Sequence, residues 1–555
     1  MRLGRALPCG ARFASAAVAL AIVQMCGFAQ SSTRCPRFPV GSVITAPEDL
    51  FSENGVIDVS FTYQTTTDQY GNTLYCFVNS DGAQSPTLHI HPGDRLRIKL
   101  TNDVPAPTGS SSATMAAMPG MTISGSPSSA CGAMTMTAAS VNIHYHGTNT
   151  PPTCHQDEVI RTLINSGQTF QYDVQFPSDE PPGLYWYHPH VHGISEPAVQ
   201  GGASGALIIE GIQNVNPMVA GLPQQLLIIR DNLVPGNPTP GGSIPSWDIS
   251  LNYTPVPYPA FTPAVIQMKP EARQLWRVLN ASADTIIDLQ LQYDGTVQPL
   301  EVVALDGVPT GSQDGTSRGN GFTETDILLA PAARAEFIVT GPSSDVQNAK
   351  LMTLNVDTGP DGDNDPMRPI ASIQANDNAP EPPLVPYVSG PPPKERFEGL
   401  NRERPTAYRK LYFSEVLSNP TNPNSPTNFY ITVDGQTPTL FSPDTPPAIV
   451  TTQGSVEDWT IENRSMENHE FHIHQLHFLV LEQNGVPVNS GQYLDTIQVP
   501  YWSGTGPYPS VKVRMDFRGP LTGDFVYHCH ILGHEDGGMM AIIRVNPPHR
   551  DGGHN

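Results

Sequence analysis

The chain has 555 residues, which is too long for one hydrophobic core and predicts about three or four domains. Only 15% of the residues are charged, and 57 prolines with 48 glycines favour short strands joined by tight turns over long solvent-facing helices. The net charge of −23 argues against a nucleic acid or an anionic membrane as a partner. After the N-terminus, no stretch is apolar for the roughly 18 residues that a membrane helix needs.

The first 29 residues are typical of a secretory signal peptide. Three arginines precede an apolar run over residues 13–25, and Gly27-Phe28-Ala29 has the small-x-small pattern of a cleavage site. Cys26 raises the alternative of a lipoprotein, but the residues just before it are not the small ones expected there. We therefore predict cleavage near Ala29 and a protein that is secreted or periplasmic.

Apolar and polar residues alternate in many short segments, which predicts an all-β protein. Residues 88–91 and 96–100 flank a Pro-Gly turn and are expected to form two half-buried strands. Helical periodicity is hard to find anywhere in the chain. Further strand-like segments lie at 171–176, 206–210, 225–229, 274–279, 335–339, 456–462 and 512–517. Repeated β-sandwiches or barrels are consistent with this pattern.

Two changes in composition divide the chain into three blocks. One lies near 211–223, after a glycine-rich segment, and the other lies in 379–394, where clustered prolines cannot sit inside a sheet. The predicted domains span residues 35–212, 213–380 and 395–548. A low-complexity loop over 108–139, rich in Ser, Gly, Ala and Met, interrupts the first block.

Five cysteines remain after removal of the signal peptide. Export permits disulfides, and four of these cysteines allow two bridges in three possible pairings. These four are Cys35, Cys76, Cys131 and Cys154. The fifth, Cys529, lies directly between two histidines.

Ten of the 17 histidines fall into four short clusters. They are His144 and His146; His188 and His190; His469, His472 and His474; and His528 and His530 with His534. A His-x-His pair on a strand places both imidazoles on one face. Neutral imidazole suits copper, and two imidazoles with one thiolate form the ligand set of a blue-copper site. Zinc is the nearest alternative, but structural zinc sites use four Cys and His ligands, far fewer than are present here.

In this order and arrangement, the four clusters resemble those of the multicopper oxidases, a family that includes laccases, ascorbate oxidase and bacterial cuprous oxidases. The signatures cover about forty residues directly and spread from 144 to 540. The resemblance implies three consecutive cupredoxin-like Greek-key β-sandwich domains, with copper ligands in the first and third. The second domain would carry no copper ligands and act as a spacer.

The resemblance also implies four copper ions and assigns ligands to each. The type 1 copper would be bound by His469, Cys529 and His534, with Met539 as a weak axial ligand. The type 2 copper would be bound by His144 and His472. One type 3 copper would be bound by His146, His188 and His530, and the other by His190, His474 and His528. The sequence departs from the family pattern at Tyr145, where Trp is common, and at Glu470, where Pro is common, but neither is a ligand position.

Reduction of dioxygen consumes protons, and two acids lie close to the clusters. Glu535 follows His534 and resembles the glutamate that passes protons to bound oxygen in bacterial members of the family. Asp157, thirteen residues after His144, resembles the acid kept near the trinuclear site, with Glu158 as its rival. The remaining histidines have less specific interpretations: His192 and His477 are expected to donate hydrogen bonds or pack, and His89 and His91 to form a solvent-facing pair.

The implied activity is one-electron oxidation of a donor at the type 1 copper, coupled to four-electron reduction of dioxygen to water at the trinuclear cluster. A laccase-like oxidase of phenols is the first expectation, and a metallo-oxidase of Cu(I) or Fe(II) is the alternative. Thioethers select Cu(I), but the methionines of loop 108–139 are equally explained as incidental or sacrificially oxidised. These are Met115, Met118, Met121, Met134 and Met136. A catalytically silent copper protein is disfavoured because no ligand position is missing, and a two-domain nitrite reductase because the chain has three blocks.

Overall fold

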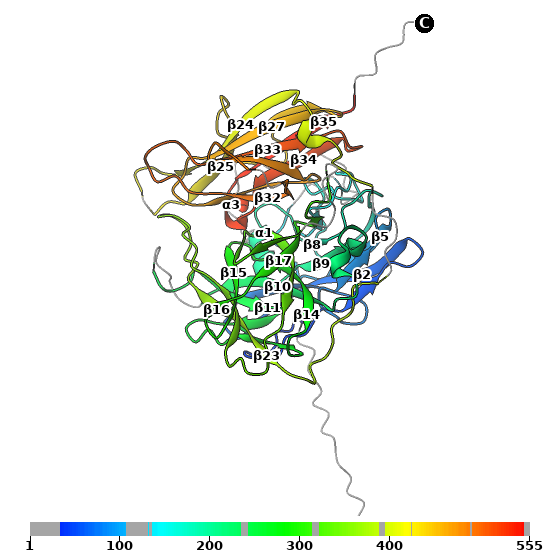
Figure 1. Ribbon diagram of the computed structural model, residues 1–555. Helices are drawn as coiled ribbons and strands as arrows, with labels where there is room; N and C mark the ends of the chain where they lie inside the picture. Colours follow the sequence, from blue (N-terminus) through cyan, green and yellow to red (C-terminus); the bar gives the residue numbers. More distant parts are fainter. Residues whose placement is uncertain are drawn as a thin grey trace, which may run out of the picture. The chain divides into compact units, whose positions relative to one another are not determined.

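The all-β architecture is confirmed by the computed structural model, in which strands form nearly all of the regular structure (Figure 1). The structure describes residues 34–106, 131, 136–234, 242–313, 321–387, 394–422, 424–488 and 491–548, which belong to one unit. The predicted signal peptide and most of loop 108–139 lie outside the described residues. Within those residues, no helix has the length and apolarity required to cross a membrane.

The first sandwich packs a five-stranded sheet against a four-stranded sheet, with strand orders β1-β4-β9-β8-β6 and β3-β2-β5-β7. Its core draws on apolar residues between 57 and 209. The strands are β1 Asp49–Phe51, β2 Val56–Thr67, β3 Thr73–Val78, β4 Thr87–Ile90, β5 Arg95–Asn102, β6 His144–His146, β7 Thr169–Gln175, β8 Leu184–His188 and β9 Gly205–Ile209.

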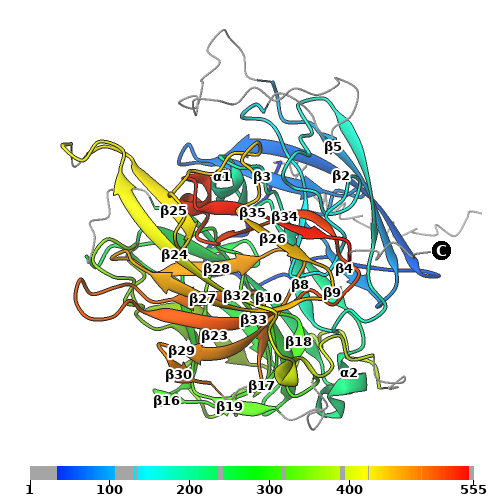
Figure 2. The same cartoon turned by 90° about the horizontal axis from the view of Figure 1, so that it is seen from above.

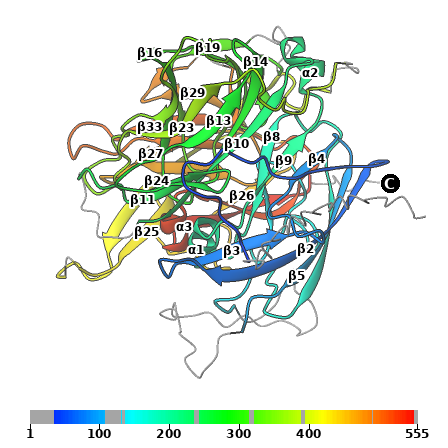
Figure 3. The same cartoon turned by 90° about the horizontal axis from the view of Figure 1, so that it is seen from below.

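The second sandwich has sheets of eight and six strands around a core that draws on residues between 227 and 373. The larger sheet contains β10 Gln224–Leu233, β11 Trp247–Leu251, β12 Thr254–Val256, β14 Arg273–Asn280, β17 Leu300–Leu305, β18 Val308–Pro309, β19 Phe322–Glu324 and β21 Arg334–Thr340. The smaller sheet contains β13 Ala264–Met268, β15 Ile287–Tyr293, β16 Thr296–Val297, β20 Ile327–Leu329, β22 Ala349–Thr353 and β23 Arg368–Ala375. Strands β10, β13 and β14 can be followed in Figure 3.

The third sandwich has sheets of seven and five strands, and its core draws on residues between 411 and 545. The larger sheet contains β24 Ala407–Leu417, β25 Thr427–Val433, β27 Val456–Asn463, β29 Phe478–Gln483, β30 Val486–Pro487, β31 Tyr493–Leu494 and β33 Ser510–Asp516. The smaller sheet contains β26 Ile449–Thr452, β28 His469–Ile473, β32 Thr496–Val499, β34 Gly523–Cys529 and β35 Met540–Asn546. Figure 2 labels β8, β28 and β34, three of the strands that carry histidines.

Helices are few and short in the described part of the chain. They are α1 Ser195–Gln200, α2 Ile212–Val215, α3 Leu532–Asp536 and the 3-10 turns η1 Pro217–Val219 and η2 Leu400–Arg402. The three cores fall within the three predicted segments, so the prediction of three consecutive β-sandwiches is confirmed. The boundaries proposed at 212, 380 and 395 remain predictions.

Two details of the first sandwich differ from the prediction. The segments flanking the Pro-Gly turn form β4 and β5 in different sheets, and all four residues of β4 are buried, so β4 is covered on both faces. His89 is therefore buried rather than solvent-facing, and it contacts Asp49 at 3.1 Å and Glu210 at 2.6 Å. His91, just after the strand, is exposed as predicted.

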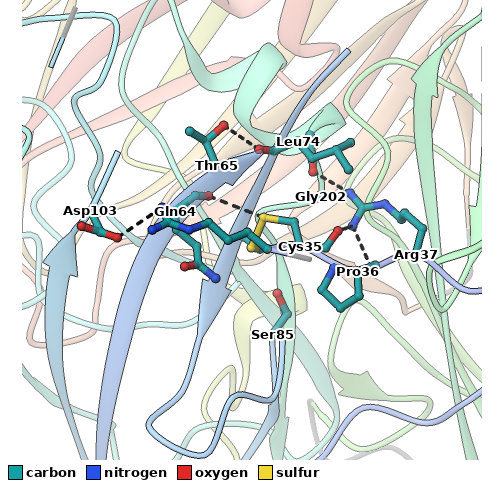
Figure 4. The surroundings of a disulfide bond; sticks show 12 residues. Cys35, Pro36, Arg37, Gln64, Thr65, Leu74, Ser85, Asp103 and Gly202 are labelled. Atoms are coloured by element: carbon teal, nitrogen blue, oxygen red, sulfur yellow. Dashed lines mark hydrogen bonds and ion pairs between the residues drawn. A yellow bond between two sulfur atoms is a disulfide. The ribbon is translucent and has the colours of Figure 1, made fainter. Parts of the chain in front are cut away.

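Two disulfides resolve the pairing that the sequence left open. Cys35 bonds Cys76, and Cys131 bonds Cys154. Figure 4 shows the first bridge, which ties the segment before β1 to β3 beside Gln64 and Arg37. Cys529 is the free cysteine of the described residues and is fully buried.

Candidate metal centres

The first sandwich places four predicted copper ligands at one edge of its five-stranded sheet. His144 and His146 lie on the edge strand β6, and the antiparallel register pairs His144 with His188 of β8. Alternation along β6 sends both of its imidazoles to one face. His190 follows β8 by two residues, and its backbone N–H donates to Asn142 Oδ1 at 2.7 Å. All four side chains are buried.

The third sandwich supplies the other four histidines from β28 and β34. The register pairs His472 with His528 and Phe471 with Cys529. Because side chains alternate across a strand, the thiol of Cys529 faces away from the imidazoles of His528 and His530. His474 and His530 follow directly after the two strands and are also buried.

The two sets of histidines meet in one cluster. The rings of His144 and His474 stack with centroids 3.8 Å apart, and those of His146 and His472 stack at 4.0 Å. The Nε2 atoms of His190, His474 and His528 lie 3.2 to 3.3 Å from one another. Three ring nitrogens that converge at this spacing are arranged like ligands of one cation. These three residues are the set predicted for one type 3 copper.

Hydrogen bonds on the outer side of the cluster orient most of these rings. Nδ1 contacts an acceptor in four of them: His144 meets Asp157 Oδ1 at 3.0 Å, and three others meet backbone carbonyls. Those three are His188 with Pro189 O at 2.9 Å, His472 with Asp495 O at 2.7 Å, and His528 with Cys529 O at 2.8 Å. His146 is reversed, because its Nε2 meets Asp495 Oδ1 at 3.1 Å. Such bonds fix the tautomer and direct the other nitrogen at a metal.

Several ring nitrogens of the cluster have no hydrogen-bond partner among the described residues. They are Nε2 of His144, His188 and His472, Nδ1 of His146 and both ring nitrogens of His530. Buried polar atoms almost always have a partner, so a group of unpaired imidazole nitrogens indicates a binding site for an electron-pair acceptor. The residues present therefore fit a metal cluster.

The cluster is built for neutral imidazoles. Burial, followed by the proximity of the other histidines, lowers the pKa of six of these rings well below the ordinary value, and burial lowers the pKa of His528 to about 3. The six are His146, His188, His190, His472, His474 and His530. The neutral ring is the form that ligates metals.

A second, separate site surrounds Cys529. Its Sγ lies 3.6 Å from Nδ1 of His469 and 3.7 Å from Nδ1 of His534, and these two nitrogens are 3.1 Å apart. The outer Nε2 of His469 meets Glu415 Oε1 at 3.0 Å, and the outer Nε2 of His534 lies 3.3 Å from Glu467 Oε1. The site thus combines one sulfur with two oriented imidazoles, the donor set of a blue-copper centre.

The backbone holds this second site together. The N–H of Glu470 points at Cys529 Sγ from 3.4 Å, and the N–H of Cys529 donates to Met539 O at 3.0 Å. Met539 is fully buried and its N–H donates to His534 O at 3.0 Å, so the predicted axial residue is tied to two predicted ligands. Burial raises the pKa of the Cys529 thiol, so formation of the thiolate requires a coordinated cation.

The predicted acids lie where they contact the histidine cluster. Asp157 is buried, and besides His144 it accepts from the backbone N–H of Tyr145 at 3.1 Å and from Gln475 Nε2 at 2.7 Å. Glu535 Oε2, on α3, lies 3.2 Å from His528 Nδ1 and 3.7 Å from His190 Nε2. Burial, with a smaller contribution from Asp536, raises the pKa of Glu535 well above its ordinary value. The rival Glu158 instead accepts from Thr162 Oγ1 and the N–H of Arg161.

Four residues of the site carried no signal in the sequence. Asp495, Glu415 and Glu467 contact predicted ligands, and Arg334 pairs with Asp495. None of them lies within a His-x-His motif, and an acid or arginine in a strand-rich chain is ordinarily solvent-facing. His192 and His477 lie outside the ligand sets, as predicted: the ring of His192 packs edge-on against Phe441, and His477 Nε2 meets Asp306 O at 2.8 Å.

Comparisons with known proteins find similarity to multicopper oxidases. Family models described as multicopper oxidase match residues 135–214 and 420–549. The multicopper oxidase mco of Staphylococcus haemolyticus (strain JCSC1435) is 24% identical over 487 residues, covering 86% of this chain and 85% of that protein. The laccase of Bacillus subtilis (strain 168) is 23% identical over 454 residues, covering 74% and 80%.

A solved structure shows the fold. The multicopper oxidase from Campylobacter jejuni, described as a metallo-oxidase, aligns with a TM-score of 0.62 at 20% identity and covers 92% of this chain and 96% of its own. The three sandwiches are therefore cupredoxin-like, as the resemblance implied.

Proposed function

We propose that this chain, which belongs to the multicopper oxidase family, oxidises a donor one electron at a time at Cys529 and reduces dioxygen to water at the histidine cluster. One observation carries the proposal. Cys529 contributes its side chain to one site, while its two covalent neighbours, His528 and His530, belong to the other. An electron would thus pass from the Cys529 site to the histidine cluster through residues that are covalently bonded to Cys529.

The donor sets support copper as the resident metal. Four ions would be held as the resemblance implies: one by His469, Cys529, His534 and Met539, and three by the eight clustered histidines. Bound copper would supply the one-electron redox chemistry at the first site and the reduction of dioxygen at the second. The chain supplies the rest: it holds neutral imidazoles in fixed tautomers and excludes bulk water from a fully buried cluster.

Glu535 is proposed to deliver protons and Asp157 to orient His144. Glu535 is fully buried within reach of ligands from both sandwiches, and Asp536 holds α3 in place by accepting from the N–H groups of Gly193 and Glu196. Asp157 binds His144 Nδ1 directly, which directs Nε2 into the cluster.

Replacing Glu535 with glutamine is expected to lower turnover by about 100-fold or more, because an amide cannot supply the protons that dioxygen reduction consumes. Copper content and reduction by the donor should be unchanged, and the loss should appear in re-oxidation by oxygen. It should be greatest at high pH, where bulk protons are scarce. Stopped-flow absorbance of the blue band separates the two half-reactions. The matched variant Glu158→Gln, whose carboxylate lies away from the cluster, should re-oxidise normally; equal losses in both variants would contradict the role of Glu535.

A small acidic pocket beside His534 bears on the identity of the electron donor. This pocket of about 20 Å³ is lined by Asp284, Asp363, Asp365 and Glu467 among others. Asp365 is 4% exposed, and its Oδ1 has no hydrogen-bond partner among the described residues. Phe429 stacks on the His534 ring at 4.4 Å and covers that face. The pocket has room for an ion but not for an aromatic ring.

This lining favours a metallo-oxidase over the laccase-like activity first expected. Carboxylate oxygens bind Fe(II) more readily than the softer Cu(I), which prefers thioethers and thiolates. The Campylobacter relative described as a metallo-oxidase is consistent with this choice, and the Bacillus relative named a laccase keeps phenol oxidation as the competing proposal. Oxygen uptake with Fe(II), Cu(I) and a substituted phenol tests both. We expect Fe(II) to have the highest kcat/KM, with four Fe(II) oxidised per dioxygen and no peroxide released.

Replacing Asp365 with asparagine is expected to raise KM for Fe(II) roughly tenfold, the loss of one charge-assisted contact, and to leave phenol oxidation unchanged. Burial raises the pKa of Asp365 to about 8, so a cation must displace a proton to bind. KM for Fe(II) in the unaltered protein should therefore fall as pH rises toward 8, and this dependence should flatten in Asp365→Asn. Asp345→Asn, at an exposed acid, is the control. A variant that weakened phenol and Fe(II) oxidation equally would contradict an ion site here.

Export is proposed as well. The described residues contain two disulfides. Disulfides form and persist in oxidising compartments, which supports a secreted or periplasmic protein. Dioxygen and a small donor would be its partners.

A further inference from the structure

The second sandwich, expected to be a spacer, reaches the histidine cluster through one buried side chain. Arg334 begins β21 and is fully buried. Its Nη1 and Nη2 donate to the two carboxylate oxygens of Asp495 at 2.7 and 2.6 Å. This bidentate ion pair links the second sandwich to Asp495, which lies between β31 and β32 of the third sandwich.

The other bonds of Arg334 hold its guanidinium in place. Nε donates to Leu184 O on β8 at 3.1 Å, and Nη1 donates to Ala332 O at 3.2 Å. Its backbone N–H donates to Asp306 Oδ1 at 2.9 Å, while Asp306 Oδ2 accepts from the N–H groups of Asp495 and Thr496 at 3.3 Å. Arg334 is thus bonded to all three sandwiches.

Asp495 in turn contacts two predicted ligands. Its Oδ1 meets His146 Nε2 at 3.1 Å, and its backbone carbonyl meets His472 Nδ1 at 2.7 Å. The rings of His146 and His472 stack on each other. His146 is the ligand whose tautomer is reversed, so the carboxylate of Asp495 determines that Nδ1, rather than Nε2, faces the cluster.

The chain leaves space for this pair beside the ligand. Gly147 follows His146 with φ of +82°, and a Cβ there would collide with Arg334 Nη2 and Asp495 Oδ2. Glycine is therefore required both by the left-handed backbone and by the close approach of the ion pair.

We propose that Arg334 is a positioning residue of the dioxygen-reducing site: by holding Asp495 at both oxygens, it fixes the ring orientation of His146 and His472. The inference rests on the proposed function of the histidine cluster. A buried carboxylate that loses its cation is strongly disfavoured, so without Arg334 the Asp495 side chain would reorient and release His146. The second sandwich is then part of the reaction site rather than a spacer.

A purely structural role is the competing explanation, and the chain offers a matched control. Arg277 on β14 and Glu336 on β21 form an equally buried ion pair, and Glu336 Oε1 accepts from the Leu184 N–H at 2.8 Å. This pair joins the same second sandwich to the same strand β8. Within the described residues, the hydrogen bonds of this pair go to Gln224 and Leu184 and not to a histidine of the cluster.

The experiment compares Arg334→Gln, Arg334→Lys, Asp495→Asn and the control Arg277→Gln in copper-loaded protein. Each is measured by copper per chain, blue absorbance, the electron paramagnetic resonance signal of the copper outside the thiolate site, and re-oxidation rate. We expect Arg334→Gln and Asp495→Asn to keep the blue band, to change the resonance signal and to slow re-oxidation by about 10- to 100-fold. The re-oxidation rate of Arg334→Lys should lie between those of the unaltered protein and Arg334→Gln, since an ammonium keeps the charge but not the paired geometry.

The double variant Arg334→Gln/Asp495→Asn should be no slower than the worse single variant, because both act through one contact. Arg277→Gln should lower thermal stability while leaving the resonance signal and re-oxidation unaltered. Identical behaviour of Arg334→Gln and Arg277→Gln would overturn the proposal, as would an unchanged signal in both Arg334 variants. Gly147→Ala crowds the pair without removing its charge, and it should reproduce the slower re-oxidation if Arg334→Gln fails to fold. A parent protein that is colourless or does not consume oxygen would instead refute the proposed function itself.

Discussion

Replacing Cys529 with serine is expected to abolish the blue colour and to reduce donor oxidation by at least about 100-fold. A hydroxyl does not replace a thiolate as a ligand for copper, and loss of a direct ligand exceeds the 10- to 100-fold typical of an outer contact. Copper analysis should show about three ions per chain instead of about four. Donor oxidation is followed by oxygen uptake.

The histidine cluster provides the internal control for this variant. Cys529 faces the opposite side of β34 from His528, so the copper ions held by histidine should remain. Reduction of the variant by a small mediator, followed by air, should still show re-oxidation of these ions. Retention of a blue band, or loss of all copper, would mean that the two sites are not divided at Cys529.

Replacing His144 with alanine is expected to give the opposite result. The blue band should persist, because His469, Cys529 and His534 are untouched, but donor addition should bleach it and air should not restore it. Steady-state oxygen uptake should fall by at least about 100-fold, since His144 contacts the rings of five other cluster histidines and anchors Asp157.

His192→Ala is the matched control for His144→Ala. His192 is two residues from His190 but packs against Phe441 instead of joining the cluster. This variant should keep about four copper ions and normal re-oxidation. If His144→Ala and His192→Ala lost the same signals, the cluster would not be defined by the His-x-His motifs.

Much of the candidate site followed from local pattern. Alternation on a strand places both histidines of a His-x-His pair on one face, and it places Cys529 on the face opposite His528. These relations span two or three residues, so the sequence alone is enough to predict them. The all-β architecture was predictable for the same reason, since short alternating segments and frequent Pro and Gly act locally.

Other features depended on contacts between residues far apart in the chain. His89 was expected in solvent, but it is buried and contacts Asp49 and Glu210, which are 40 and 121 residues away in the chain. The pairing of Cys35 with Cys76 and of Cys131 with Cys154 was one of three possibilities until the strands were placed. Glu535 and Glu158 both follow cluster motifs in the sequence. Only Glu535, on α3, contacts the cluster histidines His528 and His190, whereas Glu158 accepts from Thr162.

The sequence by itself predicted which residues would hold the metal, because ligand type and spacing are properties of short segments. Only the tertiary structure decided how those ligands are oriented. His146 and Asp495 are 349 residues apart, and Arg334 and Asp495 are 161 apart. No periodicity connects positions at such distances. The sequence therefore does not distinguish an acid or arginine buried where three sandwiches meet from one that is exposed to solvent. The role of the buried residue arises only when burial removes water and leaves the opposite charge as its partner.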